Sequence, residues 1–210
     1  MRYFGLLLLM SLPALGQRDL HDSNRIGING GVNQFTLMTD DFKTAPGVGW
    51  QAGLSMRGNF YNDFDMVYGI QFSENNFTVE TLTPASAQED VKYTIPSAQI
   101  SLLVSYKFIE NHLSVEFGPM LQVSGKMKID ESDEENTVVG TDLAAGDISE
   151  TSRFNLFPTV GITAGIKHLR LNVMYQYGMT NLLGALNKED LGVNFKGNAG
   201  ILSGSLIIYL

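Results

Sequence analysis

Apolar and polar side chains alternate with a period of two along most of this chain. Between residues 98 and 108 the even positions are apolar or aromatic, and the odd positions are mostly polar. After the turn at 109–112 (IENH) the alternation returns on odd numbers and continues through residue 123. A period of two is typical of β-strands, and two such runs joined by a short polar segment indicate a hairpin. Both runs exceed the usual strand length of about five to six residues.

The same alternation predicts eight strands along the chain. They cover residues 25–37, 47–60, 64–73, 91–108, 113–127, 151–166, 169–179 and 196–210. The connections at 38–46, 74–90, 128–150 and 180–195 are long, whereas the other three are tight. Bacterial outer-membrane barrels have an even number of strands, short periplasmic turns and longer outer loops. We therefore predict an all-β fold, an eight-stranded antiparallel up-and-down transmembrane β-barrel.

Within the alternating stretches of these strands no Asp, Glu, Lys or Arg lies on the apolar face. This face carries large apolar side chains, for example Trp50, Leu54, Met56 and Phe60 in the second strand. A Lys or Arg that faces lipid at mid-bilayer costs about 2–4 kcal/mol, which explains the exclusion. A soluble lipocalin-like ligand-binding barrel is the alternative, and it would carry its charges outside and its apolar side chains inside. The pattern favours the membrane barrel.

Three prolines, Pro96, Pro119 and Pro158, lie inside predicted strands. A proline cannot donate a ladder hydrogen bond and is usually found at a sheet edge or a β-bulge. Because a closed barrel has no edge, we expect bulges at these positions.

The beginning of the chain resembles a secretory signal peptide. Arg2 precedes an apolar run over 3–12, and the small residues Ala14 and Gly16 mark a cleavage site. We predict a signal peptide at 1–16, a periplasmic leader at 17–24 and the barrel domain at 25–210, located in the cell outer membrane.

Composition narrows the class of protein further. The chain lacks Cys, which excludes a disulfide framework. Charged residues make up only 17% of the chain, below the average of about 25%. The net charge of −8 and the lack of a basic run argue against a nucleic-acid partner.

Several short segments resemble the recurring motifs of the PorT-like family of outer-membrane β-barrels. These segments are 93–96 (YTIP), 106–107 (YK), 116–119 (EFGP) and 177–181 (YGMTN). The resemblance covers most of the mature chain. It implies a barrel that partners outer-membrane lipid and envelope or secretion-system proteins, with an accessory role in protein secretion. The final residue, Leu210, departs from the aromatic C-terminus usual in such barrels.

Catalytic chemistry has little support in the sequence. His21 lies in the leader, and His112 and His168 lie at tight turns, away from the outer rim. A small outer-membrane enzyme, either lipid-modifying or a hydrolase, would need a Ser/His or Asp/His constellation near that rim. We therefore predict a monomeric, non-enzymatic barrel without a cofactor, which has a structural or loop-mediated binding role. The enzyme remains the alternative.

The connection at 128–150 contains a dense acidic run. Its first members are Asp130, Glu131, Asp133, Glu134 and Glu135. Such a run is usually a solvated loop. Carboxylates are also Ca²⁺ ligands, but the EF-hand pattern fails because Glu135 stands where that loop needs glycine. We predict a solvated loop, with a calcium site as the alternative.

The polar face of the strands predicts a second cluster. Six charged residues flank the three tight turns and point inward by alternation: Arg57, Asp65, Lys107, Glu116, Lys167 and Arg170. Arg57 with Asp65, and Lys107 with Glu116, occupy roughly diagonal positions across their hairpins, within reach of long side chains. We predict a structural cluster of charges that plugs the periplasmic half of the barrel.

Overall fold

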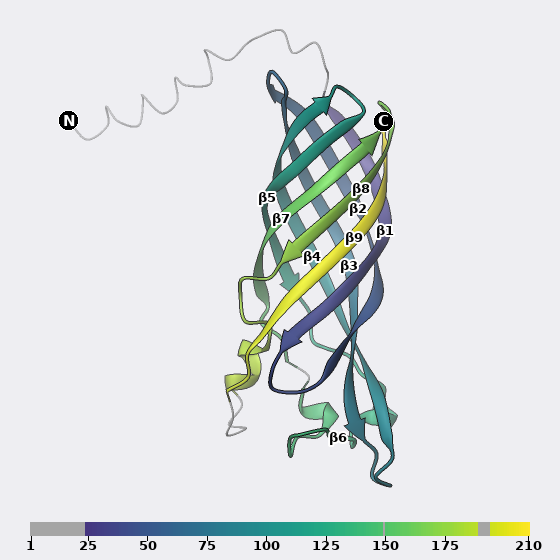
Figure 1. Cartoon of the computed structure of the whole chain (residues 1–210), viewed down its shortest axis with the longest axis vertical. Helices are drawn as coiled ribbons and strands as arrows, with labels where there is room; N and C mark the ends of the chain where they lie inside the picture. Colours follow the sequence, from purple (N-terminus) through teal and green to yellow (C-terminus); the bar gives the residue numbers. More distant parts are fainter. Residues whose placement is uncertain (1–23, 149, 189–193) are drawn as a thin grey trace, which may run out of the picture.

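The structure is a computed structural model that describes residues 24–148, 150–188 and 194–210. Eight strands form a closed antiparallel ring in the order β2-β1-β9-β8-β7-β5-β4-β3, and β3 pairs with β2 to close it (Figure 1). The strands are β1 (Arg25–Thr39), β2 (Thr44–Tyr61), β3 (Phe64–Leu82), β4 (Gln88–Ile109), β5 (Leu113–Ser124), β7 (Phe154–Gly165), β8 (Leu169–Tyr177) and β9 (Gly197–Tyr209). The predicted fold class is confirmed. The predicted signal peptide and residues 17–23 of the leader lie outside the described residues.

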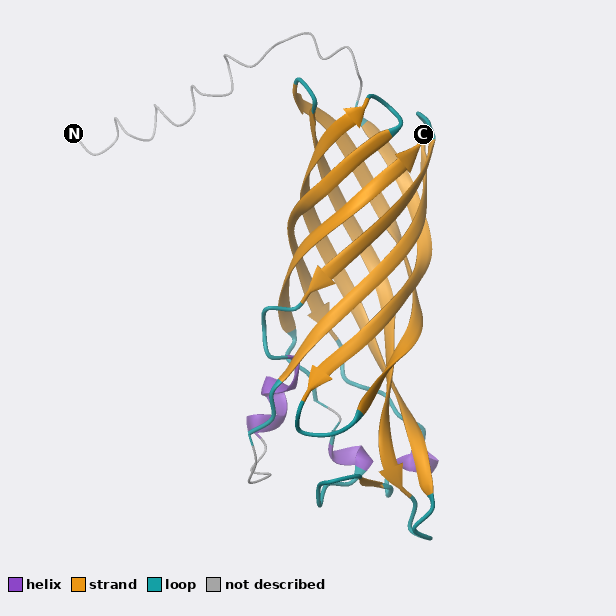
Figure 2. Cartoon of the chain, viewed as in Figure 1, coloured by secondary structure: helices purple, strands orange, loops and turns teal. Residues whose placement is uncertain are grey.

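The two ends of the barrel differ in their connections. The tight-turn end carries the connections at 62–63, 110–112 and 166–168, and Leu210 also lies there (Figure 1). Asn62 (φ 46°) and Asn111 (φ 60°) adopt positive φ in two of these turns, a conformation that asparagine tolerates better than most residues. The long-loop end carries the other connections. It also carries the short 3₁₀ helices η2 (Glu131–Asp133), η3 (Ala145–Asp147) and η4 (Leu182–Lys188), as Figure 2 shows.

The outer face of the barrel is a belt of exposed apolar side chains. Side chains of alternate residues are exposed along each strand, for example Ile26 (54%), Leu54 (55%) and Ile162 (54%). Their neighbours in sequence point inward and are mostly small or polar. Since successive side chains of a strand point to opposite faces, the alternation in the sequence correctly predicts which face each strand residue occupies.

Residues 74–90 do not form the predicted long loop. Instead β3 continues to Leu82 and β4 begins at Gln88, and the two strands stay paired from Phe64–Tyr106 to Leu82–Gln88. The prediction was wrong because the polar outward residues Glu74, Thr78 and Glu80 hid an alternation with apolar inward residues. This β3–β4 extension projects beyond the other strands at the long-loop end (Figure 1).

The expected bulges at the three prolines are also absent. Pro96 pairs with Glu74, and Pro119 pairs with Pro158, each within an unbroken register. In β5 the ladder to β4 runs from Met120–Ser101 to Phe117–Val104 without a shift. The register shifts occur elsewhere, in β2 between Pro46 and Trp50 and near the tight turns. A strand residue directs its N–H toward only one neighbouring strand, so a proline forfeits one bond without displacing the ladder.

A hydrophobic core fills the long-loop end of the barrel and extends into its connections. On β3 and β4 the inward face changes from polar residues to Phe77, Val79, Val91, Tyr93 and Ile95, all completely buried. The connection at 128–150 contributes Val138, Ala145 and Ile148 to this core, and its strand β6 (Thr137–Val138) pairs with Thr81 and Leu82 of β3. Among the described residues no helix is long and apolar enough to cross a membrane.

Candidate functional site

Charged side chains gather inside the barrel at the tight-turn end, and we call them the interior charge cluster. Its members are Arg25, Arg57, Asp65, Lys107, Glu116 and Arg170, from β1, β2, β3, β4, β5 and β8. Five of the six are at most 6% exposed, and the Lys107 side chain is 11% exposed. Because the strands close into a ring, inward residues that are far apart in the sequence meet in one layer of the barrel interior.

Arg57 is the centre of the cluster. Its Nη1 lies 3.2 Å from Oδ2 of Asp65 and donates to the Ser105 hydroxyl at 2.8 Å. Its Nη2 pairs with Oε1 of Glu116. A planar guanidinium carries several donors in a fixed geometry and can bridge two carboxylates, which an ammonium group does less well. Arg57 therefore connects β2 with β3, β4 and β5.

Lys107 has a different partner from the predicted one. Its Nζ lies 3.2 Å from Oδ1 of Asp65, so Asp65 is shared by Lys107 and Arg57. The strand register explains this choice. Glu116 pairs across the hairpin with Ser105 rather than with Lys107, and Lys107 pairs with Ser114. Glu116 also accepts a hydrogen bond from Nδ2 of Asn172 at 3.2 Å, which extends the network to β8.

Arg25 and Arg170 add two cations beside this network. Arg25 Nη1 donates to Oδ1 of Asn111 and to the carbonyl of Lys167, both at 3.2 Å. The Arg170 guanidinium carbon lies 6.0 Å from the ring centroid of Tyr209, at the edge of the range of a cation–π contact. Arg25 was missed by the sequence analysis, although its inward position in β1 follows from the alternation with Ile26 and Ile28.

Lys167, in contrast, is not a member of the cluster. Its side chain is exposed, because β7 ends at Gly165 and Lys167 lies in the following turn. The alternation of faces applies only within a strand. The prediction that Lys167 points inward was therefore wrong, and only its backbone carbonyl contacts the cluster, through Arg25.

Above the charges, the middle of the barrel interior is filled by uncharged polar side chains. Gln71 donates to Gln99 at 2.6 Å, Gln99 donates to Gln122 at 2.7 Å, and Gln51 donates to the Ser205 hydroxyl at 2.6 Å. A cavity of about 40 Å³ remains between this layer and Glu116. Since one water needs about 10–15 Å³ by this measure, the cavity holds only a few waters.

The acidic connection at 128–150 is folded onto the hydrophobic core. Its apolar residues are buried, whereas Asp130 and Glu131 are exposed. Asp130 caps η2, and its carboxylate accepts hydrogen bonds from the N–H and the hydroxyl of Ser132. These two bonds lower the pKa of Asp130, the N–H bond more than the hydroxyl bond. Tyr93 ties the connection to the barrel by donating to the carbonyl of Ala145 at 2.8 Å. Across the described residues no three His, Asp or Glu side chains converge as metal ligands would.

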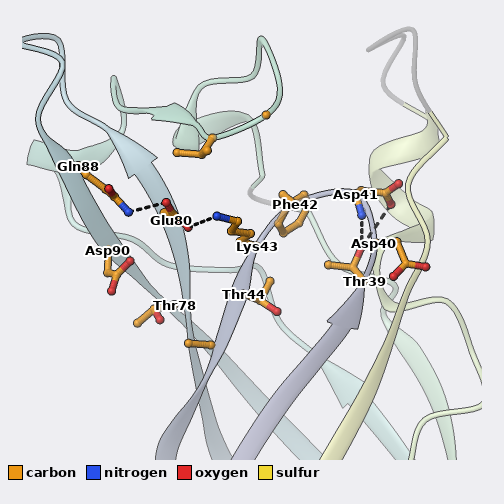
Figure 3. A pocket seen from close by; sticks show the side chains of 13 residues that line it. Thr39, Asp40, Asp41, Phe42, Lys43, Thr44, Thr78, Glu80, Gln88 and Asp90 are labelled. Atoms are coloured by element: carbon orange, nitrogen blue, oxygen red, sulfur yellow. Dashed lines mark hydrogen bonds and ion pairs between the residues drawn. The ribbon is translucent and has the colours of Figure 1, made fainter.

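A polar groove lies at the long-loop end between the β1–β2 connection and the β3–β4 extension (Figure 3). Its volume is about 810 Å³. Lys43 reaches across it to Oε2 of Glu80 at 3.3 Å, and Thr39 donates to Asp41 at 3.3 Å. Phe42 is buried beneath the groove and packs against Phe195. Some of the side chains that line the groove therefore bind one another.

The two histidines of the described chain sit at the tight-turn end. His112 Nδ1 lies 2.8 Å from the carbonyl of Glu110, and His168 Nδ1 lies 3.2 Å from the carbonyl of Tyr209. Both contacts are to backbone oxygens rather than to a serine or a carboxylate. His21 lies outside the described residues.

A closed ring of strands with an apolar outer belt and a polar interior defines a transmembrane β-barrel, because only a closed barrel satisfies the backbone of strands within lipid. The family model described as "Outer membrane protein beta-barrel domain" matches residues 16–184, and the chain belongs to this family. The protein therefore resides in the outer membrane, as predicted, and the soluble lipocalin-like alternative is wrong.

Similar barrels are found among solved structures. Neisserial surface protein A (NspA) aligns with 10% sequence identity and a TM-score of 0.50, over 89% of this chain and 99% of that one. OprG from Pseudomonas aeruginosa aligns with 13% sequence identity and a TM-score of 0.46, over 90% of this chain and 96% of that one. Ail of Yersinia pestis aligns with 13% sequence identity and a TM-score of 0.45, over 90% of this chain and 99% of that one. At this identity the likeness to NspA supports the fold alone. A search of curated protein sequences finds no significant match.

Proposed function

We propose that this protein is a non-conducting, non-enzymatic barrel of the cell envelope whose ordered long-loop end binds a partner. One observation carries the proposal: both ends of the barrel interior are filled. The interior charge cluster occupies the tight-turn end, the hydrophobic core occupies the long-loop end, and a cavity of about 40 Å³ lies between them. An eight-stranded barrel is just wide enough for side chains to fill it. The described residues therefore leave a solute no open path through the interior.

A binding role is supported by the way in which the long-loop end is built. Its connections are held by a shared apolar core and by hydrogen bonds such as that from Tyr93 to Ala145. Preorganised loops lose less conformational entropy on binding than mobile ones. The resemblance to the PorT-like family extends the proposal to an accessory role in protein secretion, and this extension depends on the resemblance alone.

The first test is electrical. The purified barrel, inserted into a planar lipid bilayer, should give no stable conductance steps in 1 M salt, because no water-filled path crosses it. Insertion is verified separately by protease resistance of the barrel and by the fluorescence of Trp50, the one tryptophan of the chain. Reproducible open-channel steps from verified protein would refute the non-conducting part of the proposal.

The second test concerns orientation and uses single cysteines, since the chain has none of its own. Ala85→Cys lies at the tip of the β3–β4 extension, and Asp63→Cys lies in an exposed tight turn. A membrane-impermeant maleimide should label Ala85→Cys on intact cells and should label Asp63→Cys only after the outer membrane is opened, because short turns face the periplasm in such barrels. The reverse pattern would invert the topology.

The same two cysteines can carry a photoreactive cross-linker to capture the partner. Capture of a discrete protein through position 85 supports binding at the long-loop end. Capture of secretion-system proteins through position 63 supports the accessory role instead. If neither position gives a discrete adduct in cells, the binding role fails, although the non-conducting barrel stands.

A further inference from the structure

Four exposed basic side chains lie together on one side of the barrel at its long-loop end. We call them the basic patch, and they are Lys92, Lys126, Lys128 and Arg153. They come from β4, from the segment after β5 and from the segment before β7. Only Lys126 and Lys128 are close in the sequence, so no run of basic residues reveals the patch.

Backbone hydrogen bonds bring these residues together. The N–H of Ser124 donates to the carbonyl of Arg153 at 2.8 Å, which places Arg153 beside the end of β5. After Ser124 the chain continues beside β4. The N–H of Gly125 donates to the carbonyl of Pro96 at 2.8 Å, and Lys128 and Thr94 exchange two backbone hydrogen bonds of 2.9 Å. Lys92 lies two residues from Thr94, so Lys92 and Lys128 are diagonal neighbours, whose Cα atoms are typically about 7–8 Å apart. Buried Met127 lies between Lys126 and Lys128 and leaves both side chains facing solvent.

Only one of the four cations forms an ion pair with a described carboxylate. Lys126 pairs with Glu150 at 2.5 Å, whereas Lys92, Lys128 and Arg153 form no ion pair with a described carboxylate. Other acidic residues lie nearby: Glu74 on β3, Glu89 and Asp90 further along β4, and Asp130 at the start of the acidic run. Like charges on neighbouring strands repel each other, and an anion between them relieves the repulsion. Three unpaired cations therefore favour an anionic ligand.

The position of the patch relative to the apolar belt indicates the kind of anion. Arg153 directly precedes Phe154, which is 67% exposed on the outer face, and Lys126 lies three residues beyond Val123, which is 42% exposed. The acidic run begins two residues after Lys128 and belongs to the connection that lies beyond the strand ends (Figure 1). Along β4 and the segment after β5, exposed apolar residues are thus followed by cations and then by Asp130, while Glu74 and Glu150 lie at the level of the cations. Lipid molecules present the same order of acyl chain and phosphate.

We propose that the basic patch binds the phosphate groups of lipid molecules whose acyl chains pack on the apolar belt of β4, β5 and β7. The long side chains of Lys and Arg can extend from the belt into the head-group layer, and cations next to an anionic membrane surface attract it. Arg153 provides a planar fork that suits a phosphate, and the lysines provide point charges. The site therefore selects phosphorylated lipids over uncharged ones on one side of the barrel.

The inference deepens the role of the long-loop end proposed above, and its test does not depend on the topology in cells or on a protein partner. The barrel is placed in nanodiscs of zwitterionic lipid, and a bis-phosphorylated glycolipid is titrated in. Its dephosphorylated form is titrated in parallel. Native mass spectrometry counts bound lipid. The variant Lys128→Gln/Arg153→Gln removes two cations from the patch.

A matched variant, Lys43→Gln/Lys196→Gln, removes two cations from the same end of the barrel but outside the patch, beside β2 and β9. The patch variant should bind the phosphorylated lipid about tenfold more weakly than the wild type, whereas the matched variant should stay within about twofold. Protease resistance of the barrel checks that both variants fold. An equal loss in the two variants, no loss in the patch variant, or equal binding of the dephosphorylated lipid would overturn the proposal.

Discussion

Glu116→Gln is expected to lower the free energy of unfolding of the barrel by about 3–5 kcal/mol, because it removes one of the two carboxylates that neutralise the buried cations of the interior charge cluster. Glu116 is 1% exposed and pairs with Nη2 of Arg57, which is 4% exposed. After the substitution, Asp65 is the last carboxylate of the interior charge cluster, and Lys107 already shares it. Urea unfolding in lipid vesicles, followed by the fluorescence of Trp50, measures the loss.

A double-mutant cycle separates this ion pair from general damage. Arg57→Met/Glu116→Gln should be less destabilised than the sum of its single variants, with a coupling of about 2 kcal/mol or more, since removing both charges leaves neither unpaired. The coupling between Lys107→Met and Glu116→Gln should be smaller, because Lys107 pairs with Asp65. Lys167→Met is the control, and as an exposed turn residue it should change stability by less than about 0.5 kcal/mol. Additive losses in the Arg57–Glu116 cycle would show that the two side chains do not meet.

Phe77→Ala should destabilise the long-loop end by about 3–5 kcal/mol, as expected for truncation of a buried aromatic side chain. Phe77 is completely buried, and its ring centroid lies 5.2 Å from that of Tyr93 and 5.8 Å from that of Phe35. The hydrophobic core also anchors the connection at 128–150, so a protease specific for Glu should cleave this connection faster in Phe77→Ala. Local opening of this kind can precede global unfolding.

Two further variants locate the effect. Tyr93→Phe keeps the ring and loses only the hydrogen bond to Ala145, so it should cost about 1 kcal/mol and should accelerate cleavage of the same connection. Leu82→Ala lies at the tip of the β3–β4 extension, is 39% exposed in the wild type, and should cost less than about 1 kcal/mol. Resistance of the connection to protease in Phe77→Ala would mean that the core does not hold it.

The sequence alone predicted the barrel because each strand must keep charge away from one face. The alternation of faces correctly distinguishes inward Asp65 and Glu116 from outward Leu54 and Ile162. It also correctly places Arg57, Lys107 and Arg170 inside the barrel, since these residues alternate with apolar neighbours. It fails at Lys167, where the strand has already ended.

The extension of β3 and β4 was missed for a related reason. Residues 74–90 are polar on average, and average polarity indicates a loop. Phe77, Val79, Val91 and Tyr93 nevertheless continue the inward positions of their strands. The informative signal was the change of the inward face from polar to apolar while the outward face became polar. This change marks the point at which the surroundings of the barrel turn from lipid to water.

The sequence by itself determined where most strands lie and which face each presents to the interior, because both depend on neighbours within a few residues. It did not determine the length of every connection, since β3 and β4 continue through most of the predicted loop at 74–90. Only the tertiary structure decided which charges pair, since the register between β4 and β5 places Glu116 opposite Ser105 and thus beside Arg57 rather than Lys107. It likewise decided that the acidic connection folds onto a core and that Lys92, Lys128 and Arg153 share one surface. These contacts join residues from several different strands, and their geometry follows from the twist and closure of the ring, which local sequence does not encode.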